Sequence, residues 1–302
     1  MIGQSHFAGV NRLIEDRLRA VGTLIVAHRG TAIASVVENT AAAVLAALAS
    51  GSDVVEVDVT AAADGAFFAF HDGEEQRLLG ITSNLTTMAA QHIRDLRYRH
   101  VERPGRPAPV EPLMGLLDSF RGSALFHLDR SWPWWPALLP ALDELDMQQQ
   151  LLLKSPADTG HVQVLRRHPT KYPYMPICRT LAQAHQHLED PQVNTVGVEL
   201  LAEDASSPFL NPEVIAGLRA RGVFTLVNSE VLTTGRALFA GYDDELSVLI
   251  DPQAGWGPML ELGIDAIQTD WPWLLRDHRD QHWTRRHPGT PRTKRVSARG
   301  QN

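Results

Sequence analysis

The stretch GSDVVEVDV, residues 51–59, decides the fold. Its segment from Val54 to Val59 predicts a strand on which Glu56 and Asp58 point to one face, because side chains two positions apart on a strand share a face. Two carboxylates that face an apolar interior need compensation, which a bound cation, a basic partner or protonation would supply. A hard divalent cation is the most economical of these, although for such a pair taken alone a buried ion pair with an arginine is favoured.

Around this strand, short β-rich runs alternate with longer runs rich in alanine and leucine, which is typical of an α/β protein with a mostly parallel sheet. We therefore predict a TIM-type (β/α)8 barrel. The predicted strands are Thr23 to His28, Val54 to Val59, Phe67 to His71, Ala124 to Asp129, Gln150 to Lys154, Tyr174 to Cys178, Val196 to Leu200, Val223 to Asn228 and Ala266 to Thr269.

These nine strands are one more than a closed barrel of eight can use. The irregularity is expected between the second and third strands. Only about eight residues separate Asp58 from Phe67, too few for a crossover helix. This connection is therefore either an extended return or a hairpin.

Three regions are expected along the chain. Residues 1–22 are predicted to form a lead-in helix, and residues 23–275 a single barrel domain. Residues 276–302 contain eight Lys or Arg against two Asp and are expected to be a disordered basic tail. The segment Glu102 to Pro112, rich in proline and charge, is predicted to be a surface loop within the barrel domain.

Helices are predicted between the strands. Three examples are Glu38 to Ser50, Trp135 to Asp146 and Pro212 to Arg221. The last of them has Asn211 as its N-cap and proline at its first position, which is a typical helix start.

Composition excludes several classes of protein. The chain has 302 residues, 44% of them apolar, and its net charge of -7 makes nucleic acid an unexpected partner. The single cysteine, Cys178, excludes an internal disulfide and a paired-thiol site, and it indicates a reducing compartment. The longest run of small apolar residues, Ala41 to Ala49, is far shorter than the roughly 20 residues that span a bilayer. No export signal is visible, so we expect a cytoplasmic protein without a membrane anchor.

Polar residues stand at the ends of the predicted strands, and in a barrel these ends converge on one mouth. His28 and Arg29 end the first strand and His71 ends the third. Cleavage of a phosphodiester needs a base for the attacking hydroxyl, an acid for the leaving oxygen and positive charge near the phosphate. His28, His71, Arg29 and a cation held by Glu56 and Asp58 would supply all of these.

Two more strand ends carry candidates. Asp129 would complete a ligand set with Glu56 and Asp58. His127 shares the face of Asp129, so either or both could reach the site. An equally good alternative is that His127 is simply a strand residue packed in the core. Lys154 closes an apolar strand and is well placed to meet a phosphate as a point charge, with snorkelling to solvent as the alternative.

Taken together, these motifs resemble the glycerophosphodiester phosphodiesterase family, part of the phospholipase-C-like phosphodiesterase superfamily of TIM barrels. The resemblance covers roughly residues 23 to 275. It runs through HRG (28–30), ENT (38–40), GSDVVEVDV (51–59), DG (64–65), HD (71–72) and GIDAIQTDWP (263–272). It implies that His28 and His71 are the acid and base, that Arg29 contacts phosphate, and that Glu56 and Asp58 bind Mg²⁺ or Ca²⁺.

The chain departs from the family pattern in places. Many members carry Glu-x-Lys on the fourth strand, where this chain has His-Leu-Asp-Arg, so Asp129 is the expected third metal ligand. The loop GEEQRLLG, residues 73–80, is unusual and is expected to shape the leaving-group pocket. The tryptophans at 132–135 and at 271 and 273 are either core residues or stack on a sugar or glycerol, and Trp271 is a candidate substrate contact. Glu38 and Asn39 are expected to tether the first loop.

The expected function is hydrolysis of a small phosphodiester. Glycerophosphodiesters are the family default, which places the protein in glycerol and lipid metabolism, and a sugar phosphodiester is weighted more than usual. The alternative is a lyase or transferase that forms a cyclic phosphate or acts on agrocinopine-type sugar phosphodiesters. A catalytically idle barrel that binds phosphorylated metabolites would be marked by loss of a histidine or a metal ligand, and none of the five principal residues is lost. The oligomeric state is not indicated.

Overall fold

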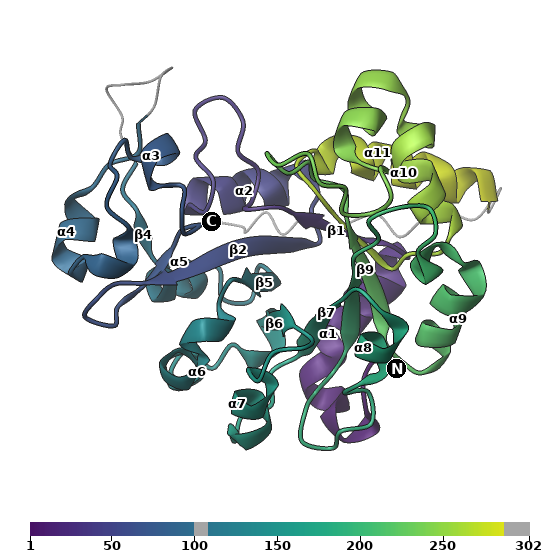
Figure 1. Cartoon of the computed structure of the whole chain (residues 1–302), viewed down its shortest axis with the longest axis horizontal. Coiled ribbons are helices and arrows are strands. Elements are labelled where there is room, and N and C mark those ends of the chain that lie inside the picture. The colour runs from purple at the N-terminus through teal and green to yellow at the C-terminus, as the bar shows by residue number, and fades with distance from the viewer. Residues whose placement is uncertain (100–107, 287–302) are drawn as a thin grey trace, which may run out of the picture.

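The computed structural model describes residues 1–99 and 108–286, and these form a closed barrel of eight parallel strands (Figure 1). The barrel closes because β1 pairs in parallel with both β10 and β2. The eight strands are β1 (Leu24–Ala27), β2 (Val54–Ala61), β5 (Phe126–Asp129), β6 (Leu151–Pro156), β7 (Tyr174–Cys178), β8 (Gly197–Leu200), β9 (Phe224–Asn228) and β10 (Ala266–Thr269). The predicted barrel is confirmed, and every predicted strand is present with its ends moved by at most two residues.

The predicted irregularity is a hairpin. Strand β3 (Phe67–Ala69) runs antiparallel to β2, with Val59 opposite Ala69, and the two-residue strand β4 (Glu111–Pro112) pairs with its other edge. A separate apolar cluster, centred on Phe68 and Phe70, fills the space beneath this unit. The hairpin therefore stands outside the barrel wall and resolves the excess of one predicted strand.

The barrel interior changes from apolar to polar along the strands. Near their N-terminal ends, inward side chains such as Val54, Leu152 and Leu226 pack in one apolar cluster. Two residues further on, the same face of each strand carries a polar group: Glu56, Lys154 and Asn228. Because alternate residues of a strand share a face, the apolar layer supports the polar layer directly above it.

Helices surround the strands (Figure 1). The α-helices are α1 (Ala8–Val21), α2 (Ala41–Ser50), α3 (Glu75–Leu78), α4 (Ala90–Asp95), α5 (Leu113–Ser119), α6 (Trp135–Asp143), α7 (Val162–Arg167), α8 (Leu181–His185), α9 (Pro212–Ala220), α10 (Pro252–Glu261) and α11 (Pro272–Arg286). Asn211 is the N-cap of α9, as predicted, since its side chain accepts a hydrogen bond from Glu213 N at 2.9 Å. Helix α2 begins at Ala41, later than predicted, because Thr40 is its N-cap.

Both ends of the described chain pack on the barrel. Ile14 of α1 joins the apolar cluster at the N-terminal ends of the strands. The predicted boundary at Leu275 falls inside α11, so residues 276–286 are helical rather than disordered. Arg279 holds them in place, donating to Thr23 O and to Asp53 Oδ2, each at 2.7 Å.

The rest of the expected tail, residues 287–302, and residues 100–107 of the expected surface loop lie outside the described residues. Within the described part of the chain, no helix is long and apolar enough to cross a membrane.

Candidate active site

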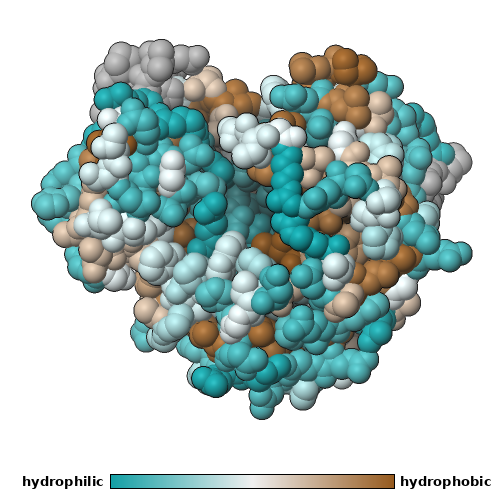
Figure 2. All heavy atoms as spheres, in the orientation of Figure 1, coloured by the Kyte–Doolittle hydropathy of each residue, from teal (hydrophilic) through white to brown (hydrophobic). Residues whose placement is uncertain are grey.

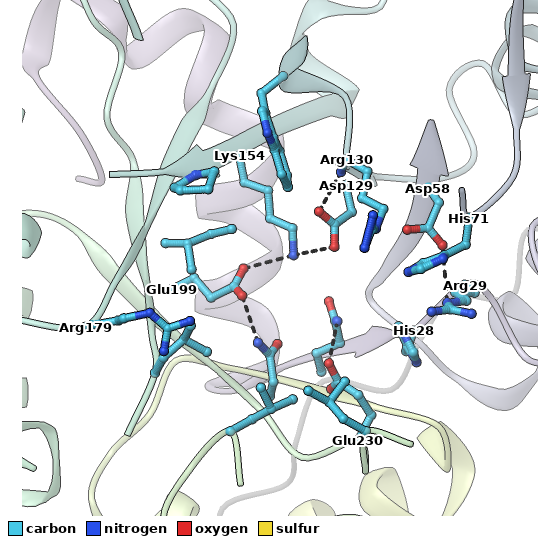
Figure 3. Close-up of a pocket in the computed structure, with 18 of the residues that line it drawn as sticks. His28, Arg29, Asp58, His71, Asp129, Arg130, Lys154, Arg179, Glu199 and Glu230 are labelled. Atoms are coloured by element: carbon cyan, nitrogen blue, oxygen red, sulfur yellow. Dashed lines mark hydrogen bonds and ion pairs between the residues drawn. The ribbon is translucent and has the colours of Figure 1, made fainter. Parts of the chain in front are cut away.

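A cavity of about 390 Å³ opens at the C-terminal ends of the barrel strands. Figure 2 shows it as a hollow bordered mainly by hydrophilic residues, and Figure 3 shows its wall in detail. Six of the predicted site residues line it, whereas Glu56 is fully buried and is not part of its wall. The six are His28, Arg29, Asp58, His71, Asp129 and Lys154. The folded chain thus brings together side chains that are more than 120 positions apart in the sequence.

Three carboxylates lie close enough together to hold a cation. One oxygen each of Glu56, Asp58 and Asp129 lies within 4.8 Å of the others. Glu56 Oε2 accepts a hydrogen bond from Arg29 N at 2.6 Å, but its Oε1 is buried and has no hydrogen-bond partner among the described residues. Burial and the neighbouring Asp58 hold the pKa of Glu56 well above its usual range. A divalent cation would reverse that shift, so these residues fit a metal with oxygen ligands.

The HRG motif shapes the loop that carries Arg29. Arg29 has a φ of 53° and Gly30 a φ of 76°, both in the left-handed region. A Cβ at position 30 would lie 2.7 Å from the Cβ of Ala43 in α2, so only glycine fits there. This turn aims the backbone N–H of Arg29 at Glu56 and places the guanidinium Nε 3.2 Å from Asp58 Oδ2.

Glu38 and Asn39 bind the side chains of Arg29 and Asp58 in addition to tethering the first loop. The Asn39 amide donates to Asp58 Oδ2 and accepts from Asp58 N, both at 2.9 Å. Glu38 accepts from Arg29 Nη1 at 2.7 Å and from Arg77 Nη2 at 2.8 Å. Asn39 therefore positions Asp58, a candidate metal ligand, and Glu38 positions Arg29, the candidate phosphate contact.

The loop of residues 73–80 does not line the cavity, contrary to the expectation that it shapes the leaving-group pocket. Glu75 turns it away, because its side chain accepts from Gly73 N at 2.9 Å and from Leu85 N at 3.0 Å. Arg77 of this loop donates to Glu38, which also accepts from Arg29. The loop supports the site from outside the cavity.

His28 is held by a carboxylate at the end of β10. Its Nδ1 lies 2.9 Å from Asp270 Oδ1, which leaves Nε2 for the cavity. Burial lowers the pKa of His28, but the hydrogen bond to Asp270 and the charges of Glu230, Asp270 and Glu56 outweigh burial and raise this pKa to about 10. His28 is therefore protonated at neutral pH.

His71 has the opposite character. Burial lowers its pKa, and the charges of Arg29 and Arg130 lower it further against the attraction of Asp58. Its Nδ1 is buried without a hydrogen-bond partner in the described structure. His71 is therefore neutral at neutral pH. The two histidines, which face one cavity (Figure 3), thus differ in protonation state.

Lys154 is buried rather than snorkelling to solvent. Its Nζ lies 2.9 Å from Asp129 Oδ2 and 3.0 Å from Glu199 Oε2. Burial opposes the charge of Asp129, but Lys154 outweighs burial and lowers the pKa of this carboxyl to about 2. Glu199 in turn accepts from Asn228 Nδ2 at 2.8 Å, so a hydrogen-bonded chain crosses the cavity floor from β5 to β9.

Two other candidates lie away from the cavity wall. His127 pairs in register with Glu56 and is fully buried. Among the described residues, it does not belong to the group of side chains that could hold a metal ion. Burial and the charge of Lys154 hold its pKa well below its usual value. Trp271 is 37% exposed and packs on Trp273, with ring centroids 5.3 Å apart, whereas the tryptophan that lines the cavity is Trp132.

Several cavity residues have no individual sequence motif. Glu199, Asn228, Glu230 and Arg179 come from strands β7 to β9 or the residues that follow them. A polar residue within or just after an apolar strand, as in VEL (198–200) and LVNSE (226–230), is the signal that could have found them. The same signal marks Asp270, directly after β10.

Comparisons with known proteins agree with the barrel fold. Solved structures with the same fold include a glycerophosphodiester phosphodiesterase from Agrobacterium tumefaciens, 23% identical over 85% of this chain and 99% of its own, with a TM-score of 0.61. A glycerophosphoryl diester phosphodiesterase from Parabacteroides distasonis is 15% identical over 89% of this chain and 92% of its own, with a TM-score of 0.70.

A third similar structure contains a product. It is a phosphodiesterase from Oleispira antarctica in complex with sn-glycerol-3-phosphate, 17% identical over 85% of this chain and 96% of its own, with a TM-score of 0.62. At these identities the structures show a shared fold. No curated protein is similar enough in sequence to count as a match.

The family comparison covers most of the chain. The model of the glycerophosphoryl diester phosphodiesterase family matches residues 28–273, from the first cavity histidine to the start of α11. With the closed barrel and the grouped strand-end residues, this match shows that the chain belongs to the glycerophosphoryl diester phosphodiesterase family.

Proposed function

We propose that the protein is a metal-dependent hydrolase of glycerophosphodiesters or a related small phosphodiester. The observation that carries the proposal is the grouping of Glu56, Asp58 and Asp129 beside His28 and His71. The family match supports the phosphodiesterase class, and the product in the Oleispira antarctica relative supports a substrate that contains phosphoglycerol.

The two histidines divide the proton transfers. Neutral His71 accepts the proton of the attacking hydroxyl, from water or from a neighbouring hydroxyl of the substrate, as that oxygen bonds to phosphorus. Protonated His28 donates from Nε2 to the leaving alcohol oxygen as its bond to phosphorus breaks. Asp270 holds the His28 ring through Nδ1, so the donating nitrogen keeps its direction.

Positive charge from a cation, Arg29 and Lys154 would stabilise the phosphate. Glu56, Asp58 and Asp129 would hold Mg²⁺ or Ca²⁺, which supplies Lewis-acid stabilisation of the phosphoryl oxygens when bound. Arg29 contributes a planar donor next to Asp58. Lys154 holds Asp129 and Glu199 and adds positive charge to the cavity wall.

Turnover with product identification tests this proposal. Glycerophosphocholine and bis(p-nitrophenyl) phosphate are incubated with the full chain and Mg²⁺, Ca²⁺ or EDTA, and phosphorus NMR follows the products. A phosphomonoester as the final product supports hydrolysis, whereas a cyclic phosphate that persists would assign the lyase alternative. Absence of turnover with either metal, together with an unchanged His28→Ala variant, would overturn the enzyme proposal.

The cytoplasmic location stays a prediction. Cys178, the only cysteine of the chain, is buried with a pKa that burial raises above its usual value, so it is a structural and not a reactive thiol. The expected partner is a small-molecule phosphodiester.

A further inference from the structure

One cationic side chain of the cavity wall has no counter-charge among the described residues. The cationic groups that line the cavity are His28, Arg29, Arg130, Lys154 and Arg179. All but Arg130 pair with a carboxylate: His28 with Asp270, Arg29 with Asp58 and Glu38, Lys154 with Asp129 and Glu199, and Arg179 with Glu203. No described residue accepts a hydrogen bond from the guanidinium of Arg130 or forms an ion pair with it.

The carboxylates near Arg130 already have partners. Asp129, which precedes it, lies 2.9 Å from Lys154 Nζ through Oδ2 and accepts from the backbone N–H of Arg130 at 2.6 Å through Oδ1. Asp58, which pairs with Asp129 in register, lies 3.2 Å from Arg29 Nε through Oδ2. An anionic group that enters the cavity can therefore pair with the guanidinium of Arg130 without breaking an existing ion pair.

The backbone of Arg130 has the same unusual arrangement as that of Arg29. Arg130 has a φ of 51°, in the left-handed region that a residue with a Cβ rarely adopts, and Arg29 has a φ of 53°. Each follows a barrel strand, and each donates its backbone N–H at 2.6 Å to a carboxylate of the group that could hold a cation, Asp129 for Arg130 and Glu56 for Arg29. A disfavoured conformation at both places indicates that the position of each side chain is constrained.

Arg130 stands near the histidine that would act as the base. Figure 3 shows its side chain beside Asp129, on the side of His71. Burial lowers the pKa of His71, and the charge of Arg130 contributes to lowering it further. The side chain of Arg130 is only half-buried, so a ligand in the cavity can reach it. A planar guanidinium at this place can bind two oxygens of one phosphoryl group.

We propose that Arg130 is a further phosphate-binding residue, which supplies positive charge that no carboxylate of the described residues neutralises. Asp58 and Glu38 offset the charge of Arg29, whereas the charge of Arg130 is available to the phosphoryl oxygens. Fixed donors of this kind stabilise a phosphoryl group during its transfer. The inference rests on the proposed function, because that function places a phosphate between His28 and His71.

Isothermal titration calorimetry of the full chain with Mg²⁺ tests this role without requiring turnover, with glycerol 3-phosphate and inorganic phosphate as ligands. Arg130→Gly removes the guanidinium, keeps the backbone N–H that Asp129 accepts, and suits the left-handed backbone. We expect this variant to have at least the wild-type Tm and to bind both ligands about tenfold or more weakly, as for a lost hydrogen bond to a charged group. Arg130→Lys should lie between the two, since it keeps the charge but loses the planar donor pair.

Two controls separate direct contact from a general effect of charge. Arg179→Met removes a cavity arginine that Glu203 already neutralises, and it should weaken binding by less than about threefold. Guanidinium chloride, at a concentration too low to unfold the protein, should restore part of the affinity of Arg130→Gly. Sodium chloride at the same ionic strength should not restore it.

Four outcomes would overturn the role of Arg130. Wild-type affinity in Arg130→Gly means that the guanidinium does not bind the phosphate, and an equal loss in Arg179→Met means that only the total charge of the cavity matters. A loss that is the same in Arg130→Lys and that guanidinium does not reduce would assign Arg130 a structural role. If the wild type itself binds neither ligand, the phosphate site fails, and the proposed function fails with it.

Discussion

The cavity has two sides that differ in how the chain builds them. On the β2 side, defined by His28, Arg29, Glu56, Asp58 and His71, the residues come from short motifs within 44 positions of one another. On the β9 side, defined by Glu199, Asn228, Glu230, Leu232 and Leu238, single residues come from two strands and a long connection. The carboxylates on the β2 side fit a cation, whereas on the β9 side two buried oxygens, Asn228 Oδ1 and Glu230 Oε2, accept no hydrogen bond from the described residues. Short local motifs therefore build the β2 side of the cavity, whereas separate strand ends build the β9 side.

The largest predicted effect separates the two histidines of the β2 side. His28→Ala should lower kcat/KM for glycerophosphocholine by about 10²- to 10⁴-fold, the usual contribution of a general acid. The same variant should lose much less with bis(p-nitrophenyl) phosphate, because p-nitrophenolate leaves without a proton. His71→Ala should lose activity with both substrates, since both need the base. An equal loss in His28→Ala with both substrates would contradict the assignment of His28 as the acid.

The next effect concerns Lys154, which joins the two sides. Lys154→Met leaves Asp129 and Glu199 buried without their cation, and it should lower the free energy of unfolding by about 3–5 kcal/mol. Urea denaturation followed by circular dichroism measures this change. Lys171→Met is the matched control, because Lys171 Nζ donates to the backbone carbonyls of Leu165 and Arg166, and roughly 1 kcal/mol or less is expected. Similar losses in both variants would show that Lys154 does not compensate the two carboxylates.

Asp270 should set the alkaline limit of activity. The acid His28 is active while protonated, so kcat/KM should fall as pH rises through about 10, and the base His71 should be lost as pH falls below its lowered pKa. Asp270→Asn should move the alkaline limb down by about one pH unit or more and leave the acid limb in place. The pH profile of Asp118→Asn, an exposed control, should match the wild type. An alkaline limb that stays near 10 in Asp270→Asn would contradict the role of this carboxylate.

The smallest effect is a stability cost on the β9 side. Burial and nearby Asp270 and Asp244 raise the pKa of Glu230 to about 7 against the attraction of His28. The folded state then binds the proton more tightly than the unfolded state, so stability falls as pH rises from the unfolded pKa to about 7. Glu230→Gln should remove this slope and gain roughly 1–2 kcal/mol relative to the wild type between pH 5 and 8. Glu213→Gln, at an exposed position, should behave as the wild type; a wild-type slope in Glu230→Gln would show that Glu230 does not titrate as described.

Local patterns were sufficient to predict the barrel and the β2 side. The alternation of apolar strands and helical runs determines a parallel sheet, and Glu56 and Asp58 share a face because of strand geometry alone. The loop of residues 73–80 was assigned wrongly, because its direction depends on Glu75 bonding the backbone of Gly73 and Leu85. The predicted start of the disordered tail, residue 276, was also wrong. The composition there is polar, but Arg279 binds Asp53 and holds this segment, as part of α11, against the barrel.

Local sequence patterns could not predict the residues of the β9 side. Nothing near Glu230 in sequence shows that Gln268, 38 positions away, will hold one of its oxygens and leave the other free. Likewise, Asp270 meets His28 only because β10 closes the barrel against β1. These contacts depend on strand order, which periodicity does not encode.

We propose that phosphodiester cleavage depends on a cation held by Glu56, Asp58 and Asp129. The most direct test is the turnover of glycerophosphocholine as a function of Mg²⁺ or Ca²⁺ concentration, starting from EDTA-treated protein, in the wild type and in Glu56→Gln. We expect no turnover in EDTA, saturable recovery with metal in the wild type, and a loss of about a hundredfold or more in Glu56→Gln. Full activity in EDTA, or a Glu56→Gln variant as active as the wild type, would contradict it.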